Sequence, residues 1–448
     1  MRRLATLHLL SAKKLQESLP VREGEIRDML DAIATDVSAA DVTKTGATTS
    51  VSSCAAAGAA KSAAAADEGI EVRRYLNRAT LNNILRLAVG KRFGYSSIRG
   101  AAGTTPKAIL DAAMRIDWNE RITAMSAEKR GGGFRGTADA AVAAPAMGNE
   151  ASASAAEENW RLLSPLTEDV PEVNPSSMTD KAEGEVAFAI IEEGFAVAGA
   201  FNIADYVPLL NYLDPQRMYA RAQRLAPQLH GFMRACIEER RRIVLQKNRA
   251  DGNETALVDV LFEIEGEGED EMDKDEMLML AIDMMMAGTD TTSKTVEWAL
   301  AELAQHPDML ERLRAEVDEA YAKSASAAAK TGAAPAGGSD LMVSLPVAEI
   351  PFLEPAAPDV TGQNFSLLPF GSGRRGCLGT NLGLDLSARL LANFVLRFDF
   401  KLPDDVRAAG GVDMTETFGL TMALAKPLRI VVRERKPVAG AVVAASGA

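Results

Sequence analysis

A segment of more than thirty residues in the second half of the chain predicts one unusually long helix. In "DKDEMLMLAIDMMMAGTDTTSKTVEWALAELAQHP", residues 273–307, apolar side chains recur every three or four positions. Asp273 followed three residues later by Glu276 is typical of a helix N-terminus, and Pro307 marks the end. A helix of this length crosses a whole domain, so we expect the rest of the chain to pack around it.

The centre of this segment, "AGTDTT" at residues 287–292, is unfavourable for a helix. A glycine inside a helix costs about 1 kcal/mol relative to alanine, and threonine and aspartate compete for backbone hydrogen bonds. A locally widened helix would open a groove here, in which Asp290 and Thr291 pass protons into an apolar site. The alternative interpretation is a polar patch that faces solvent.

The rest of the chain predicts further helices and little β-structure, so the fold class expected is mainly α with a small β component. The clearest strand is "PLRIVVRER" near the end, where β-branched and charged residues alternate. Helical spacing of apolar residues marks four other segments, at residues 21–37, 79–94, 183–201 and 216–247.

Composition excludes several classes of protein. With 448 residues, 47% of them hydrophobic, the chain is able to bury a large core, and its net charge of -13 argues against a nucleic-acid partner. Only three cysteines and three histidines are present, all far apart. They form neither a disulfide framework nor a zinc or histidine metal site, so no disulfide partner is expected.

Four stretches rich in alanine, glycine and serine interrupt the helical pattern. We interpret the chain as one domain over residues 1–448, with disordered insertions at 36–69, 131–156 and 323–339 and a disordered tail at 438–448. Alanine tracts also favour helix, which is the alternative for these stretches. No run of eighteen apolar residues is present, and the basic N-terminus is expected to begin an amphipathic helix.

The segment "FGSGRRGCLG", residues 370–379, sets one cysteine in a glycine-rich turn before a predicted helix. At the N-terminus of that helix, the dipole and free N–H groups favour a thiolate at Cys377, which is a good iron ligand. Arg375 is placed to pair with a carboxylate on a flat ligand. The alternative is a glycine-rich turn that holds a buried thiol.

These residues carry a family resemblance. The pattern Phe370-x-x-Gly373-x-Arg375-x-Cys377-x-Gly379 resembles the haem-thiolate signature of the cytochrome P450 family. The segment "AGTDTT" resembles that family's oxygen-activation motif, and the two motifs occur in the expected order. The segments "HPDMLERLRAEVDE", "AFNIADYVPLLNYLDPQ" and "FGLTMALAKPLRIVVR" resemble plant microsomal members that hydroxylate phenylpropanoids and flavonoids.

The resemblance implies a cytochrome P450 fold that binds haem b, with Cys377 as the axial ligand of its iron. Asp290 and Thr291 would deliver protons during the activation of dioxygen. The resemblance also implies the positions that contact the haem, which are Ala287, Gly288, Phe370, Arg375, Gly379 and Arg2. Of these, Ala287 and Gly288 would line an oxygen groove, and Arg375 and Arg2 would each bind a haem propionate.

The function implied is that of a monooxygenase acting on an apolar small molecule, such as a plant secondary metabolite. One oxygen atom of dioxygen would enter the substrate, with electrons supplied from NADPH through NADPH–cytochrome P450 reductase. Lys13, Lys14 and Arg374 are candidates for the reductase-docking face, with ordinary solvated surface charge as the alternative. The family group is anchored in the endoplasmic reticulum membrane.

Two departures from the family set limits on this resemblance. The start of the chain resembles a family helix that contacts haem, so we expect the upstream anchor to be absent and the chain to be soluble or peripherally bound. Near Glu354 and Pro355 the sequence also omits the family's Glu-x-x-Arg helix, which braces the haem-binding core. Glu311 and Arg314 have that spacing, but they lie too close to the long helix and we treat the match as coincidental.

The sequence therefore predicts an incomplete cytochrome P450 fold with weakened haem retention. One alternative is a truncated or decayed P450-like protein that lacks catalysis. Another, from a different class, is a helical scaffold with a regulatory thiol, although it accounts for neither motif.

Overall fold

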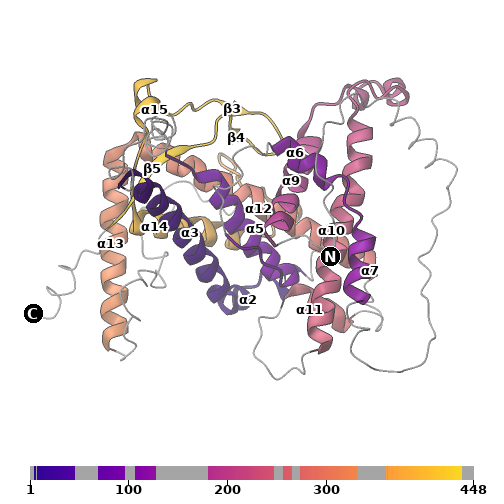
Figure 1. The fold of residues 1–448 in the computed structure, drawn as a ribbon, viewed down its shortest axis with the longest axis horizontal. Coiled ribbons are helices and arrows are strands. Elements are labelled where there is room, and N and C mark those ends of the chain that lie inside the picture. The colour runs from indigo at the N-terminus through magenta and orange to yellow at the C-terminus, as the bar shows by residue number, and fades with distance from the viewer. Residues whose placement is uncertain are drawn as a thin grey trace, which may run out of the picture.

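A computed structural model describes residues 5–6, 8–45, 69–95, 106–127, 180–246, 256–264, 273–330, 360 and 362–435. Most of these residues lie in helices, with small antiparallel sheets toward one end of the molecule (Figure 1). The prediction of a mainly α fold with a small β component is confirmed.

The long predicted helix is present as α12 (Lys274–Gln305) and runs through the middle of the molecule (Figure 1). Asp273 and Glu276 form the predicted capping box at its start, with the Asp273 N–H donating to Glu276 Oε2 at 3.3 Å. His306 caps its end, and Pro307 is the first residue of α13 (Pro307–Lys330). Pro307 therefore starts the next helix as well as ending this one.

The other helical segments predicted from apolar spacing are all present. The described helices beside α12 and α13 are α2 (Ala12–Glu17), α3 (Leu19–Thr45), α5 (Val72–Val89), α6 (Pro106–Ala113), α7 (Trp118–Ala127), α9 (Asp180–Gly199), α10 (Met218–Gln246), α11 (Leu257–Ile264), α14 (Thr380–Arg397) and α15 (Asp404–Ala408). None of the described helices is long and apolar enough to cross a lipid bilayer.

Two small antiparallel sheets are present in the described residues. The first has the strand order β1 (Ile70–Glu71), β5 (Arg429–Glu434), β2 (Phe398–Lys401), and its centre is the strand that the sequence predicts near the C-terminus. The second is a hairpin of β3 (Glu416–Thr417) and β4 (Ala423–Leu424), in which Thr417 pairs with Ala423. Five residues thus separate the paired ends of this hairpin.

The buried core consists of two hydrophobic clusters, and both α12 and α5 pass through each of them. Met285 and Leu85 belong to the first cluster, while Leu300 and Leu76 belong to the second. Figure 1 shows the two helices at the centre of the molecule. The polar centre of α12 therefore lies between two packed apolar regions.

Gly288 in this polar centre faces α5. A Cβ atom placed on Gly288 would lie 2.8 Å from Ile84 Cγ1, which is closer than such atoms approach in proteins. The absence of a side chain therefore lets α12 pack closely against α5. This contact gives a structural reason for a glycine that the sequence assigned to an oxygen groove.

Helices extend into two of the four low-complexity stretches. The helix α3 continues to Thr45 and α13 continues to Lys330, as expected for alanine-rich tracts with helical propensity. The other parts of the four stretches lie outside the described residues, namely residues 46–68, 131–156, 331–339 and 438–448.

Candidate functional site

The cysteine loop, residues 362–379, folds into a tight turn through local hydrogen bonds. The Cys377 N–H donates to the Phe370 carbonyl at 2.7 Å. Gly371 and Gly373 adopt left-handed backbone conformations, with φ of 68° and 66°. Side chains other than glycine rarely adopt these angles, so the glycines are required for the turn.

Cys377 lies immediately before α14, as predicted. Gly379 is the N-cap of α14, and the Thr380 hydroxyl donates to the Cys377 carbonyl at 3.1 Å. The thiol is exposed, so the alternative of a buried thiol in this turn is wrong. Cys236 contrasts with it, because burial raises the pKa of the Cys236 thiol and makes it unreactive.

Phe370 and Arg375 lie on either side of the turn. The Phe370 ring packs over the first turn of α14, since a Cβ on Gly383 would lie 3.6 Å from Phe370 Cε1. Arg375 ends the short 3₁₀ turn Gly373–Arg375 and is exposed. It makes no ion pair with any other residue in the described part of the chain, so its guanidinium is available to a ligand.

One face of α12 is open to solvent at Ala287 and Thr291. Both residues are exposed, and residues four apart lie on the same face of a helix. The Thr291 hydroxyl donates to the Ala287 carbonyl at 2.8 Å. Every residue of α12 is α-helical, so the predicted local widening of this helix is wrong.

Asp290 is buried, although it is adjacent to Thr291 in the sequence. Only 3% of Asp290 is exposed, and its Oδ2 accepts a hydrogen bond from the Thr421 hydroxyl at 2.5 Å. The Lys294 ammonium binds the same carboxylate and also donates to Thr421 Oγ1 at 2.7 Å. The alternative of a solvent-facing patch thus describes Thr291 and is wrong for Asp290.

Lys294 and Thr421 are site residues that the sequence reasoning missed. The signal for Lys294 was present, because a lysine four residues after an aspartate lies on the same face of a helix. Thr421 is 131 residues from Asp290, and no local pattern connects the two.

The helix that follows Cys377 is held on α3 by buried charges. Arg22 Nε lies 2.9 Å from Asp385 Oδ2, and Arg389 Nε donates to Asp385 Oδ1 at the same distance. Arg389 Nη1 also lies 3.6 Å from Glu23 Oε1. These pairs fix the middle of α14, two turns beyond the cysteine.

Glu311 and Arg314 do not form the family's bracing pair. Arg314 Nη2 lies 3.1 Å from Asp399 Oδ1 of β2, and Glu311 is exposed on α13. The match in spacing is therefore coincidental. The Glu354–Pro355 join lies outside the described residues, and so does Arg2.

The chemistry of the donor set at Cys377 fits haem. No group of three or more histidine, cysteine or acidic side chains that would hold a metal ion is found in the described ranges. A single cysteine thiolate is one of the side chains that hold haem iron in proteins. Exposed Phe365 and Leu367 offer apolar surface within the same loop, and Arg375 offers a charge for a carboxylate.

Lys13 and Lys14 lie on α2, where both approach Glu17. Lys14 Nζ lies 2.7 Å from Glu17 Oε2, whereas Lys13 is more loosely placed at 3.8 Å from Oε1. Arg374 is exposed in the cysteine loop. These placements agree with both interpretations of the basic residues, a docking face and solvated charge.

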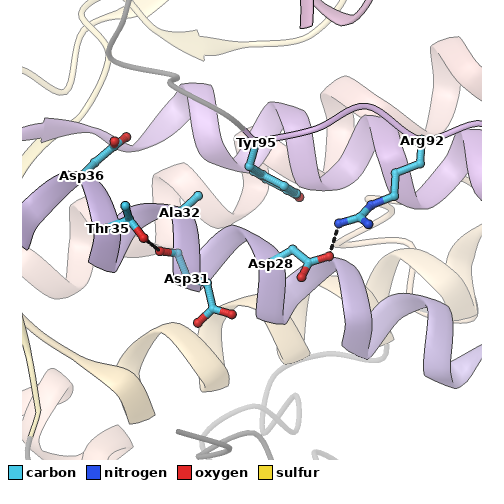
Figure 2. A pocket seen from close by; sticks show the side chains of 7 residues that line it. All are labelled: Asp28, Asp31, Ala32, Thr35, Asp36, Arg92 and Tyr95. Carbon is cyan, nitrogen blue, oxygen red and sulfur yellow. Dashed lines mark hydrogen bonds and ion pairs between the residues drawn. The ribbon is translucent and has the colours of Figure 1, made fainter. Parts of the chain in front are cut away.

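A pocket of about 320 Å³ lies between α3 and the segment that follows α5, and none of the described predicted site residues lines it (Figure 2). Its charged groups are paired. Arg92 binds Asp28, Arg397 Nη1 donates to Asp31 at 2.5 Å, and the Tyr75 hydroxyl donates to Asp36 at 2.5 Å. The pocket is lined by Asp28, Asp31, Ala32, Thr35, Asp36, Arg92 and Tyr95.

Comparison with known proteins finds plant relatives. The chain is 31% identical over 304 residues to cytochrome P450 78A1 of Zea mays, an alignment that covers 55% of this chain and 54% of that protein. It is 30% identical over 302 residues to flavonoid 3'-monooxygenase of Arabidopsis thaliana, covering 54% and 57%. It is 31% identical over 323 residues to dimethylnonatriene synthase of Zea mays, covering 57% and 60%.

The chain thus spans less than two thirds of the length of these relatives. The sequence profile of the family described as Cytochrome P450 matches residues 175–331 and 352–422, which is about half of the chain. The second matched range includes the cysteine loop and α14, and the first includes α12 with Asp290 and Thr291. The chain belongs to the cytochrome P450 family.

Proposed function

We propose that the protein is a haem-thiolate monooxygenase that inserts one oxygen atom of dioxygen into an apolar small molecule. The observation that carries this proposal is the exposed thiol of Cys377 in a glycine turn directly before α14. This thiol is accessible at the surface, and a cysteine thiolate is able to bind iron.

Bound haem would supply the iron chemistry that activates dioxygen, and a thiolate ligand would favour cleavage of the O–O bond. Cys377 Sγ would hold the iron, and the exposed Arg375 guanidinium would bind a carboxylate of the haem. Phe370, which packs over the first turn of α14, and Gly379, which lies beside Cys377 Sγ, would contact the haem. Ala287 would line the oxygen groove from the open face of α12, Gly288 would keep this helix close to α5, and Arg2 would bind a second carboxylate of the haem.

Two side chains of α12 would handle protons. The Thr291 hydroxyl lies on the open face of the helix, where it is able to donate a proton to the reacting oxygen once it is released from the Ala287 carbonyl. Asp290 would return a proton to the Thr291 oxygen after its carboxylate takes that proton from the Lys294 ammonium bound to it. Lys294, whose side chain is 18% exposed, would regain the proton from solvent, and Thr421 keeps the carboxylate ordered.

The substrate class and partner follow from the relatives as proposals. One relative is named flavonoid 3'-monooxygenase, which supports an aromatic plant metabolite as substrate. Electrons would come from NADPH through NADPH–cytochrome P450 reductase, with Lys13, Lys14 and Arg374 as candidate docking residues. We place the protein at the endoplasmic reticulum membrane by the same analogy.

The direct test supplies the purified protein with haem, a plant NADPH–cytochrome P450 reductase, NADPH and isotopically labelled dioxygen. Flavanones and simple phenylpropanoids serve as the substrate probes, and mass spectrometry detects the products. We expect a product that carries one labelled oxygen atom from the wild type and from Cys236→Ala, but not from Cys377→Ala. Absence of labelled product from haem-loaded wild-type protein contradicts the proposed activity.

The second candidate is a P450-like protein that does not retain haem and has no catalytic activity. It is favoured by the local character of the cysteine loop, in which the Cys377 N–H donates to Phe370, seven residues away, and the Thr380 hydroxyl donates to Cys377, three residues away. Titration of the apoprotein with haem separates the two candidates. Binding that saturates at one haem per chain supports the monooxygenase, and non-saturating binding supports the second candidate.

A further inference from the structure

The arm of the β3–β4 hairpin that returns from its tip is attached along α12. Thr421 donates to Asp290 at 2.5 Å, and about two turns further along the helix the Trp298 indole N–H donates to the Met422 carbonyl at 3.1 Å. The Leu424 carbonyl then accepts from Arg73 at 2.8 Å. Thr421 is the attachment nearest to the tip of the hairpin.

The tip itself, residues 418–420, is apolar and exposed. Phe418 is 80% exposed and Leu420 is 57% exposed. The backbone at Leu420 nevertheless lies against the end of α9, because a Cβ on Gly199 would lie 2.0 Å from the Leu420 nitrogen. The tip therefore bridges α9 and α12 while presenting apolar side chains to the outside.

Lys294 joins the same three elements. Its ammonium binds both Asp290 and Thr421, and it lies 5.9 Å from the centre of the Phe195 ring on α9. Only 18% of the Lys294 side chain and 4% of the Asp290 side chain are exposed. A pair as buried as this one depends strongly on all of its hydrogen-bonding partners.

We propose that Lys294 and Thr421 are positioning residues, which hold the Asp290 carboxylate in place and couple it to the apolar tip of the hairpin. The role of Asp290 as proton donor rests on the proposed function, whereas the coupling itself does not.

The coupling is tested by hydrogen exchange of the haem-free protein, followed by mass spectrometry of peptides that cover residues 416–424. Thr421→Val removes the hydroxyl at nearly constant volume, and Lys294→Met removes the charge at nearly constant length. Thr421→Ser and Lys294→Arg restore the hydroxyl and the charge. Lys323→Met is the matched control, since Lys323 also pairs with an acid four residues away, Glu319, but on the exposed surface.

We expect Thr421→Val and Lys294→Met each to accelerate exchange of the tip amides by about tenfold, because each removes a hydrogen bond to a charged group. The serine and arginine variants should stay within about twofold of the wild type. The double variant should be no faster than the faster single variant, because both residues act on one carboxylate.

Three results would overturn the proposal. The first is that the tip amides of Thr421→Val and of Lys294→Met exchange at the same rate as those of the wild type and of Lys323→Met. The second is exchange in Thr421→Ser or Lys294→Arg that is as fast as in the disruptive variants. The third is a double variant whose acceleration is the product of the two single effects. If Lys294→Met does not fold, Thr421→Val alone tests the proposal. Thr421→Val is expected to fold, because it changes one hydroxyl on a hairpin arm whose neighbouring residues Leu420 and Met422 are exposed.

Failure of this proposal is distinguishable from failure of the proposed function. The exchange experiment uses no haem, so its result is the same whether or not the protein binds haem. Conversely, none of the exchange variants alters the cysteine loop, so haem titration of the wild type judges the proposed function independently.

Discussion

The two halves of the candidate site are held in different ways. On α12, Asp290 is buried and bonded to Thr421, which lies 131 residues away in the sequence. In the cysteine loop, Cys377 is exposed and its N–H binds Phe370, seven residues away. One half is fixed by tertiary contacts, whereas the other is a local turn on the end of a fixed helix.

This difference indicates which half of the site tolerates the loss of a contact without unfolding of the protein, and which half does not. Tertiary contacts between buried charges lose several kcal/mol when one partner is removed, while local turns at the surface open at little cost. We therefore expect the α12 half to govern global stability. The cysteine loop is expected to open locally without unfolding the rest, which also makes it the weaker half for haem retention.

The largest expected effect comes from removing the charge next to the buried Glu297 of α12. Arg73 Nε lies 2.7 Å from Glu297 Oε2, and the Glu297 side chain is fully buried. Arg73→Met leaves this carboxylate unpaired and is expected to lower the free energy of unfolding by about 3–5 kcal/mol. Urea denaturation followed by circular dichroism measures the loss.

Lys323→Met, which breaks an exposed pair on α13, serves as the control and should change the free energy of unfolding by less than about 1 kcal/mol. Equal effects of the two variants would remove the contrast between tertiary and surface contacts.

The reaction rates of the two thiols Cys377 and Cys236 test whether the cysteine loop is open to solvent. In a Cys54→Ser background, 5,5'-dithiobis(2-nitrobenzoate) should modify Cys377 rapidly, because this thiol is exposed. Cys236 should react at least about 100-fold more slowly, since it is buried, its pKa is raised, and its reaction requires opening of the core. Comparable rates in Cys377→Ala and Cys236→Ala proteins would contradict the assignment of the loop as open.

Gly288→Ala tests the close packing of α12 on α5 beside Asp290. Overpacking against Ile84 should lower the free energy of unfolding by about 1–3 kcal/mol, despite the higher helix propensity of alanine. Combining it with Ile84→Ala should relieve this clash, so that the double variant loses less than the sum of the two.

Gly24→Ala in α3 is the matched control for this test, because the added Cβ would meet only Arg86 Nη1 at 3.8 Å. It should raise the free energy of unfolding by up to about 1 kcal/mol. A stabilising Gly288→Ala would show that the two helices are not in close contact.

The smallest effect is a dependence on pH at Glu192 of α9. Glu192 is exposed on α9, but the nearby protein that partly desolvates it, and secondly the charge of Asp290, raise the pKa of this carboxyl above its ordinary value of 4.5, and solvent screening keeps the effect small. The folded state then binds this proton more tightly than the unfolded chain does, so its contribution to stability is lost as pH rises through the raised pKa. Glu192→Gln should therefore stabilise the protein at pH 7.

The stabilisation should disappear well below pH 4.5, where Glu192 is protonated in both the folded and the unfolded states. Urea denaturation at the two pH values measures it. Glu193→Gln is the control on the same helix, because Glu193 pairs with Arg221 at 2.8 Å and its removal should not stabilise the protein. No gain for Glu192→Gln at pH 7 would contradict the raised pKa of Glu192.

Local patterns were sufficient to predict much of this structure. The capping pair Asp273 and Glu276, the apolar spacing of α12 and the glycines before Cys377 are all short-range signals, and the structure confirms the elements that they predict. The motif order within the chain also pointed to the family that the comparisons establish.

Two features of the site were beyond such patterns. The packing of Gly288 against Ile84 and the bond from Thr421 to Asp290 join residues more than a hundred positions apart, so no local signal indicates them. The expected widening of α12 was wrong because threonine hydroxyls bond to carbonyls one turn earlier without breaking the helix.

The most direct test of the central claim, that Cys377 is the thiolate ligand of a haem, is the absorption spectrum of the haem-supplemented protein after reduction and treatment with carbon monoxide. We expect a thiolate-type Soret band for the wild type and for Cys236→Ala, and its loss in Cys377→Ala. No such band in the wild type, or an equal band in Cys377→Ala, would contradict the claim.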